Sequence, residues 1–289
     1  MLKIIEKSKM WISISLIILI IGLGFIFFRG LNLGIDFKGG TQISIQLNDQ
    51  ISKDEADAIV KGYSADANTT ISSNNEYEIK ATDLDSNKVS SIMNELKDKY
   101  SLDDSALLSQ TEIGASVGKE LTRNSIFAII ASSIVMLIYI AIRFEFNFGV
   151  AALIATLHDV FITVGVYAMF RIPVNTPFIA AILTIVGYSM NDTIVIFDRI
   201  RENTKKMRRA STFEIADTSL TETLKRSIYT SLSTLVTIIA INILVPSVRE
   251  FTIPLIVGII CGAYSSIFIA SPVYVLLKEN IGKKKNKKA

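Results

Sequence analysis

Long apolar runs alternate with polar segments along the chain. Six runs of about 18 or more residues are almost free of charged side chains, a pattern typical of membrane-spanning helices. The runs cover residues 10–28, 125–142, 148–170, 177–197, 228–246 and 252–277. At about 1.5 Å per residue, each helix is long enough to cross a hydrocarbon layer of about 30 Å. The pattern predicts an all-α membrane domain, a bundle of six helices.

Between the first two runs, residues 30–123 have the pattern of a small folded domain. Short alternating segments are interrupted by two amphipathic stretches with helical spacing. The expected elements are a strand over 36–47, a helix after a capping box at Ser52 to Glu55, strands near 68–72 and 76–82, a helix from Asp85, and a strand over 105–112. The order βαββαβ is that of a ferredoxin-like α+β domain.

Composition supports the membrane assignment. Half of the 289 residues are hydrophobic and only 20% are charged, against about 25% in soluble domains, which excludes a soluble enzyme and a disordered chain. The lone Cys261 and the lone His158 both lie in apolar runs. A single cysteine allows no disulfide within the chain, and we expect no zinc or haem site.

Basic residues predict the orientation of the bundle. They gather in the segment 199–226, which we expect to be a loop, and in the tail 278–289, whereas the opposite short loops hold only Arg171 and Arg249. Positively charged loops favour the cytoplasm, so both termini are expected there. Residues 30–123 are then extracytoplasmic, and with 16 acidic and 9 basic residues they carry a net charge of −7.

The expected division of the chain is 1–29 for the N-terminus and first span, 30–123 for the external domain, 124–277 for the remaining five spans with the loop 199–226, and 278–289 for the basic tail.

The lysines of the tail have two interpretations. They could bind nucleic acid, but at the end of a membrane span contact with anionic lipid is the favoured role. The first span follows lysines like a signal peptide, and we expect an uncleaved anchor because no small residues mark a cleavage site. Nucleic acid is therefore not an expected partner, and membrane lipid is.

The sequence holds no recognisable nucleotide or catalytic site. Residues Gly114 to Glu120 resemble a phosphate-binding loop, but the glycines are one residue too close and Glu120 replaces the serine or threonine. Residues 30–123 contain no histidine, cysteine or nucleophile motif. A binding or mechanical module is therefore expected, and the chain is not expected to be an enzyme.

Ionisable residues inside the runs are the candidates for function. A carboxylate at the centre of a membrane helix costs about 2.5–3.5 kcal/mol on insertion scales. Asp159 lies about eleven residues into the third run, roughly 16 Å deep and near the midplane, and Asp192 lies nearer the cytoplasm in the fourth. Asp198 and Arg199 follow at the cytoplasmic end. The acids thus lie at successive depths from the midplane to the cytoplasmic end, as a proton relay requires. We therefore expect protons as the coupling ion and no cofactor.

Each candidate also has a structural interpretation. The carboxyl groups of Asp159 and Asp192 could be held by hydrogen bonds between helices. Asp198 could form an ion pair with Arg199, Arg201 or another basic residue of the segment 199–226. His158 adjoins Asp159 in sequence, but consecutive helical residues point about 100° apart. A passive histidine is therefore favoured over a relay.

Hydroxyl side chains form a stripe along the fifth run. They repeat at intervals of three and four residues, and Tyr188 shares the helix face of Asp192 on the fourth run. The stripe comprises Thr223, Ser227, Thr230, Thr234 and Thr237. It could hold ordered water beside Asp192 or could serve ordinary packing, and Tyr188, Thr230 and Thr234 are its supporting polar candidates. In the sixth run, Gly258 and Gly262 have the spacing of a close helix contact.

The longest motif, Gly187 to Asn203 (GYSMNDTIVIFDRIREN), resembles the signature of the SecD/SecF family of protein-export proteins, in the resistance-nodulation-division superfamily. Shorter motifs agree in order along nearly the whole chain. They are Gly34 to Thr41, Arg143 to Phe146, Leu157 to Val160, Ser227 to Leu232 and Gly262 to Ser266. Lys38 departs from the family pattern, which more often has a small polar residue there.

The resemblance implies an accessory role in protein export. It implies a SecD-like partner with a matching six-span half, a SecYEG-type translocon with its ATPase, preprotein substrates, and use of the proton-motive force. Carried over by position, the ion pathway comprises Asp159, Asp192, Asp198, Arg199 and Asn203. The resemblance also implies that the external domain supports a larger one on the partner.

Two further functions are compatible with the residues. A proton-coupled exporter of small molecules or lipids from the same superfamily would share the buried acids, although such proteins usually duplicate the bundle within one chain. A membrane scaffold would use the acids for packing alone.

Overall fold

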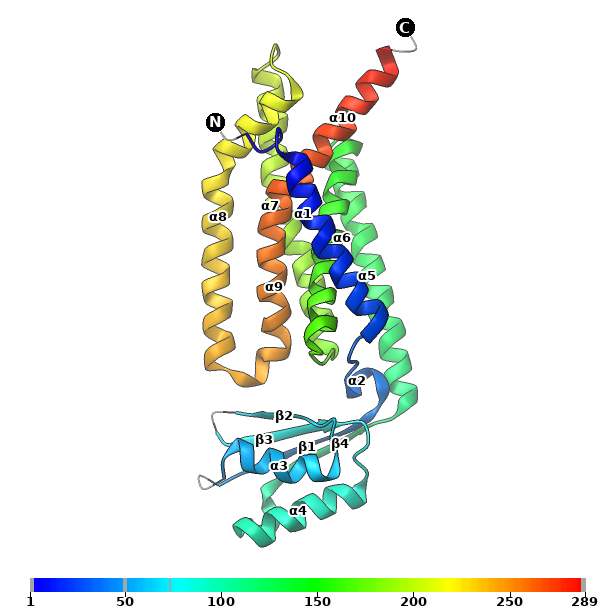
Figure 1. The fold of residues 1–289 in the computed structure, drawn as a ribbon, viewed down its shortest axis with the longest axis vertical. Coiled ribbons are helices and arrows are strands. Elements are labelled where there is room, and N and C mark those ends of the chain that lie inside the picture. The colour runs from blue at the N-terminus through cyan, green and yellow to red at the C-terminus, as the bar shows by residue number, and fades with distance from the viewer. Residues whose placement is uncertain (1–2, 49–50, 73, 287–289) are drawn as a thin grey trace.

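The computed structural model describes residues 3–48, 51–72 and 74–286, and six helices in this part of the chain are long and apolar enough to cross a membrane (Figure 1). The six predicted spans are confirmed. They are α1 (Ser8–Arg29), α5 (Ala115–Arg143), α6 (Phe146–Phe170), α7 (Thr176–Lys206), α8 (Thr212–Leu244), and a sixth span built from α9 (Arg249–Ser265), the π-helical turn η3 (Ser266–Ala270) and α10 (Ser271–Asn286). Both chain ends lie at one end of the bundle, and a small α+β domain lies at the other (Figure 1).

Helices α7 and α8 extend beyond the predicted spans. Only residues 207–211 separate them, so most of the expected loop 199–226 is helical. A capping box begins α8, because Ser211 and Glu214 exchange hydrogen bonds with each other's backbone N–H groups. The apolar pattern ends where the helices leave the bundle, although the helices themselves continue. In the tail, α10 continues to Asn286, and Lys287 and Lys288 lie outside the described residues.

The bundle has a buried centre and an exposed periphery. About half of the most apolar stretch is buried in α6, in α7 and in the α9–α10 span, whereas little of α1, α5 and α8 is buried. A Cβ atom on Gly258 would lie 2.3 Å from the Ile185 side chain, and one on Gly262 would lie 3.1 Å from Ser189 Cβ. The predicted close contact of the sixth span is therefore confirmed, and it is made with α7.

The external domain has the predicted βαββαβ order. A capping box at Ser52 and Glu55 begins its first long helix, and Asp85 caps the second. Its elements are β1 (Gly40–Gln46), α3 (Lys53–Tyr63), β2 (Asn68–Ile71), β3 (Glu76–Ala81), α4 (Ser86–Tyr100), the short η1 (Asp104–Ala106) and β4 (Leu107–Ile113). The sheet order is β2-β3-β1-β4 with every neighbouring pair antiparallel, which is the ferredoxin-like arrangement.

Alternation along the central strands buries one face of this sheet. Ile43 pairs with Ile79 and Ile45 pairs with Tyr77, and all four side chains are fully buried. They pack against apolar residues of α3 and α4, which cover the face turned away from the bundle (Figure 1). The other face of the sheet is directed toward the membrane helices.

The expected strand over 36–47 begins later than predicted. Residues Ile35–Lys38 form a short helix, α2, and the strand starts at Gly40. Gly39 has φ +84°, and a Cβ atom there would lie 2.9 Å from the carbonyl oxygen of Ile113. Only glycine accepts this conformation and this contact without strain. The alternation that predicts the strand is confined to its second half, so it does not distinguish a helical turn before it.

Several contacts attach the external domain to the bundle. Asp36 of α2 accepts a hydrogen bond from the backbone N–H of Thr176 at 2.7 Å, where α7 begins. Lys80 of β3 forms an ion pair at 3.2 Å with Glu250, in the first turn of α9 after the short η2 (Pro246–Val248). The sheet is therefore tied to both the α6–α7 corner and the α8–α9 corner.

Candidate functional site

The carboxyl group of Asp159 is fully buried on α6, inside the bundle. Two hydroxyls donate to its Oδ2 atom, Ser189 Oγ of α7 at 2.6 Å and Ser265 Oγ of α9 at 2.7 Å. Burying a carboxyl group is costly unless hydrogen bonds replace those of water. Three helices therefore meet at this acid, and the bonds between helices that the structural interpretation requires are present.

His158 contacts Asp159, its neighbour in sequence. Its Nδ1 atom lies 3.0 Å from Asp159 Oδ1, and its ring centre lies 6.2 Å from that of Tyr264 on α9. The expectation that these side chains point apart is wrong. A 100° separation of the Cα–Cβ bonds leaves consecutive side chains within reach when both turn toward the space between them. His158 is therefore part of the Asp159 cluster.

The π-helical turn η3 brings further hydroxyls to this region. Ser266 Oγ lies 2.8 Å from Thr193 Oγ1, which is one turn beyond Ser189 on α7. Turns of this kind often occur at functional sites. Residues 266–270 continue an apolar helical pattern, so the sequence gives no sign of the irregular turn.

Asp192 lies on α7, three residues after Ser189, and is only 7% exposed. Ser227 of α8 adjoins its carboxyl group, and the exposed Arg226, the residue before Ser227, contributes a positive charge nearby. Within the described residues, the Oδ2 atom of Asp192 has no hydrogen-bond partner. The Oδ2 atom of Asp159, in contrast, accepts two hydrogen bonds. A buried polar atom without a partner is uncommon and marks a candidate for function.

Arg226 is a functional candidate that the sequence analysis missed. By pattern it belongs to the basic group of 199–226 that predicts orientation. In the structure it lies on α8 next to Ser227, the second member of the hydroxyl stripe, and its positive charge lies near Asp192. The sequence does contain one indication of its role, since Arg226 directly precedes Ser227 of the hydroxyl stripe. Adjacent residues of a helix lie at nearly the same depth in the membrane.

Arg199 and Asn203 form a second polar cluster, near the end of the bundle that carries both chain termini. Arg199 Nε and Asn203 Nδ2 both donate to Glu222 Oε2 of α8, at 2.6 and 2.8 Å. Asn203 is buried and also donates to Ser219 Oγ at 2.9 Å. Glu222, which the sequence analysis did not single out, thus joins α7 to α8 one turn before Arg226.

Asp198 is separate from both clusters. Its side chain is 55% exposed and forms an ion pair at 2.7 Å with Arg201, one turn along α7. Arg199 instead pairs with Glu202 and Glu222. Among the basic residues expected as partners of Asp198, Arg201 forms the ion pair.

The hydroxyl stripe of α8 faces α7. Tyr188 Oη donates to Thr234 Oγ1 at 3.2 Å and lies 3.3 Å from the carbonyl oxygen of Thr230. The two threonine hydroxyls also donate to carbonyl groups of their own helix. Tyr188, Asp192 and Asn203 therefore place polar groups at three levels of the seam between α7 and α8. In the same described residues, no group of three or more histidine, cysteine or acidic side chains could hold a metal ion.

Comparison with known proteins identifies relatives along nearly the whole chain. A family model described as "Protein export membrane protein SecD/SecF, C-terminal" matches residues 92–280, and one described as "SecD/SecF GG Motif" matches residues 24–51. The Protein translocase subunit SecF of Sebaldella termitidis is 41% identical over 96% of this chain and 92% of its own length. The Protein translocase subunit SecDF of Bacillus subtilis is 34% identical over 94% of this chain, which spans 38% of that relative.

A solved structure agrees with the fold. The crystal structure of SecDF from Thermus thermophilus superposes with a TM-score of 0.81 at 32% identity, over 96% of this chain and 39% of that one. The glycine pair at Gly39 and Gly40 lies within the matched GG motif, and its backbone geometry explains the motif physically. The long α7 motif lies within the larger match. The chain therefore belongs to the SecD/SecF family of protein-export membrane proteins.

Proposed function

We propose that this chain, an accessory subunit of the Sec protein translocase, couples the movement of protons through the membrane to protein export. The observation that carries the proposal is Asp192, a buried acid of α7 that lies near the positive charge of Arg226 on α8. In the described residues, one oxygen of its carboxyl group has no hydrogen-bond partner. A carboxyl group in apolar surroundings can take up and release a proton. Protonation of Asp192 removes a negative charge near the guanidinium group of Arg226 and so weakens the attraction between the two side chains.

Helix α8 is the element suited to respond to that change. Little of its apolar stretch is buried within the chain, and it carries Arg226 and the hydroxyl stripe. Protonation of Asp192 weakens its attraction for Arg226, and deprotonation restores it. The contacts of Arg199 and Asn203 with Glu222 hold the neighbouring part of α8 against α7. Titration of Asp192 therefore shifts α8 relative to α7 about this attachment.

A route leads from α8 to the external domain. Through η2, α8 continues directly into α9, whose first turn holds Glu250. Glu250 forms the ion pair with Lys80 of β3 and accepts a hydrogen bond from Asn175 at 3.0 Å. Movement of α8 can thus reach the sheet through covalent continuity and one ion pair.

Asp159 and His158 supply a second exchange point. Ser189 donates to Asp159 and precedes Asp192 by one helical turn, so the two acids are linked along α7. Exchange between them through hydroxyl groups and water gives a path that continues toward Arg199 and Asn203. In this scheme Tyr188, Thr230 and Thr234 provide the polar lining between α7 and α8.

The proposal includes a partner and an orientation. SecDF relatives are more than twice as long as this chain, which supports a separate SecD-like subunit, together with a SecYEG-type translocon, its ATPase and preprotein. The basic residues near the chain ends support a location in the cytoplasmic membrane with both termini in the cytoplasm. The relatives reported above are protein translocase subunits, and no observation favours the exporter of small molecules or lipids.

The test is preprotein export into membrane vesicles with and without a proton gradient. In vesicles that contain the chain and its co-purified partners, we expect Asp192→Asn and Arg226→Gln to abolish the stimulation by the gradient and to leave the ATP-driven step intact. The matched control is Asp198→Asn, which removes an acid at an exposed ion pair and leaves most of the stimulation. Full stimulation in the Asp192→Asn vesicles would falsify the proposal.

A further inference from the structure

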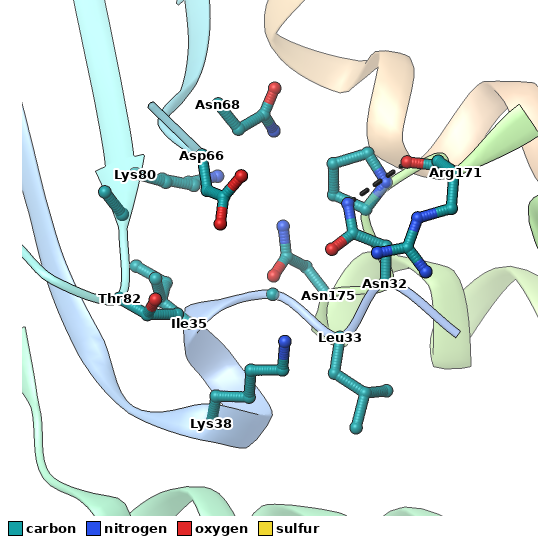
Figure 2. Close-up of a pocket in the computed structure, with 13 residues that line it drawn as sticks. Asn32, Leu33, Ile35, Lys38, Asp66, Asn68, Lys80, Thr82, Arg171 and Asn175 are labelled. Carbon is teal, nitrogen blue, oxygen red and sulfur yellow. Dashed lines mark hydrogen bonds between the residues drawn. The ribbon is translucent and has the colours of Figure 1, made fainter. Parts of the chain in front are cut away.

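A polar cavity of about 300 Å³ lies where the external domain meets the bundle (Figure 2). The linker after α1, the α6–α7 corner and residues of β2 and β3 border it. Its charged residues are Lys38, Lys80, Arg171 and Asp66. Lys80 is engaged by Glu250 and Glu78. Within the described part of the chain, Lys38 and Arg171 form no ion pair and keep their charge available to a ligand.

The charged groups of the cavity are arranged in two parts. Figure 2 shows the ammonium group of Lys38 directed toward Asn175, with the Arg171 side chain beyond it. The carboxyl group of Asp66 and the amide of Asn68 border the opposite part of the cavity, near the start of β2. One part therefore offers cations, and the other offers hydrogen-bond acceptors.

An apolar groove adjoins the cationic part. It has a volume of about 320 Å³ along the last turns of α1 and is lined by Ile21, Gly24, Phe25, Phe28 and Arg29. Arg171 Nη1 donates to the carbonyl oxygen of Arg29 at 2.9 Å, so the groove and the cavity share a border. Arg29 is the last residue of α1 and Arg171 follows the last residue of α6. Both arginines thus mark the level at which the apolar spans end, where lipid headgroups lie.

We propose that this cavity binds the headgroup of a phospholipid whose acyl chains lie along the α1 groove. Lys38 and Arg171 hold the phosphate, because charge-assisted hydrogen bonds to phosphate favour these two side chains. Asp66 and Asn68 accept hydrogen bonds from the far end of the headgroup. A headgroup that carries donors, such as the hydroxyls of glycerol, satisfies both parts, whereas choline offers no N–H or O–H donor.

Charge and shape together favour a lipid over a soluble anion. A free phosphate would use Lys38 and Arg171 but would leave Asp66 and the apolar groove without a role. The bound lipid would fill the junction between α2 and the α6–α7 corner.

The test is native mass spectrometry of the full chain, released from detergent and titrated with phosphatidylglycerol or phosphatidylcholine. We expect phosphatidylglycerol to bind more tightly, and Lys38→Gln to weaken it by roughly tenfold, the size of one charged hydrogen bond. Lys38→Arg retains binding. The matched control is Lys61→Gln, which removes the same charge from the exposed surface of α3 and leaves binding unchanged.

Two outcomes would overturn the proposal. Equal affinity of the wild type, Lys38→Gln and Lys61→Gln variants for phosphatidylglycerol would exclude the cavity as its site. Inorganic phosphate that displaces the lipid at equal concentration would identify a free anion as the ligand. Asp66→Asn gives a further check, because it should reduce the preference for phosphatidylglycerol over phosphatidylcholine without loss of folding.

Discussion

Ser265 donates a hydrogen bond to Asp159 at 2.7 Å across 106 positions of the sequence. With the bond from Ser189, it fixes one oxygen of the buried acid between three helices. Asp192, three residues after Ser189 on the same helix, has an oxygen without such a partner in the described residues. The two acids therefore differ in what holds them, and removal of each charge should have a different consequence.

Asp159→Asn should destabilise the protein more than Asp192→Asn. An amide oxygen in the place of Oδ2 can keep both serine hydrogen bonds, but the NH₂ group then replaces the acceptor Oδ1 beside His158 Nδ1, so we expect a loss of about 1–3 kcal/mol. At position 192 no such pair of hydrogen bonds is present in the described residues, so the expected loss is smaller, about 0.5–1 kcal/mol. Thermal unfolding of the purified variants in detergent measures the difference. If both variants lost the same free energy of unfolding, Asp192 would be held as firmly as Asp159, and the prediction would be wrong.

Gly165→Ala should disturb the packing of α1 on α6. A Cβ atom at position 165 would lie 2.8 Å from Gly22 Cα, and backbone atoms cannot move aside without shifting the helix. We expect a loss of about 1–3 kcal/mol, as for other overpacked contacts. Gly187→Ala is the matched control, because a Cβ atom there meets nothing within 4 Å. The prediction is wrong if both variants unfold at the same temperature.

Lys80 and Glu250 should be energetically coupled. Their side chains are 16% and 20% exposed, so water screens the ion pair less than at the surface. A double-mutant cycle with Lys80→Met and Glu250→Gln should give a coupling free energy of about 0.5–2 kcal/mol. The exposed pair Lys3–Glu6, with side chains 69% and 59% exposed, is the control and should give a value near zero. No coupling between Lys80 and Glu250 would remove the ion pair from the proposed route to the external domain.

The external domain should lose stability in acid through Asp57. Burial by itself would raise the pKa of this carboxyl, but hydrogen bonds from Lys53, Tyr77 and Thr69 together hold its pKa below the ordinary value. A lowered folded-state pKa means that the charged form stabilises the fold above the unfolded pKa of about 3.9, and that this contribution is lost as the pH falls through the folded value.

Hydrogen exchange of α3 and β2 amides, corrected for intrinsic rates, measures this effect. Protection should fall as the pH drops below about 4 in the wild type. Asp57→Asn should be less protected at pH 6 and should change less on acidification. An identical acid response in the variant would assign the loss of stability to other carboxyl groups.

Local patterns predicted most of the architecture. The six spans follow from apolar length, and the βαββαβ order follows from alternation and from side-chain caps at Ser52 and Asp85, all of which act within a few residues. The candidate acids Asp159 and Asp192 are visible because a charge inside an apolar run is costly wherever the run packs. Nothing in that reasoning depends on which helices are neighbours.

The tertiary structure decided the partners of those acids. Ser189 and Ser265 donate hydrogen bonds to Asp159, and Glu222 accepts hydrogen bonds from Arg199 and Asn203, each by contact between separate helices. The charge of Arg226 on α8 lies near Asp192 on α7. Such contacts depend on the rotation and depth of both helices, which hydropathy does not encode. The sequence by itself thus determined the spans, the external domain and the buried charges, because each has a local free-energy cost. Only the packing of helices decided which groups face those charges, because hydrogen bonds and ion pairs depend on distances that the fold sets.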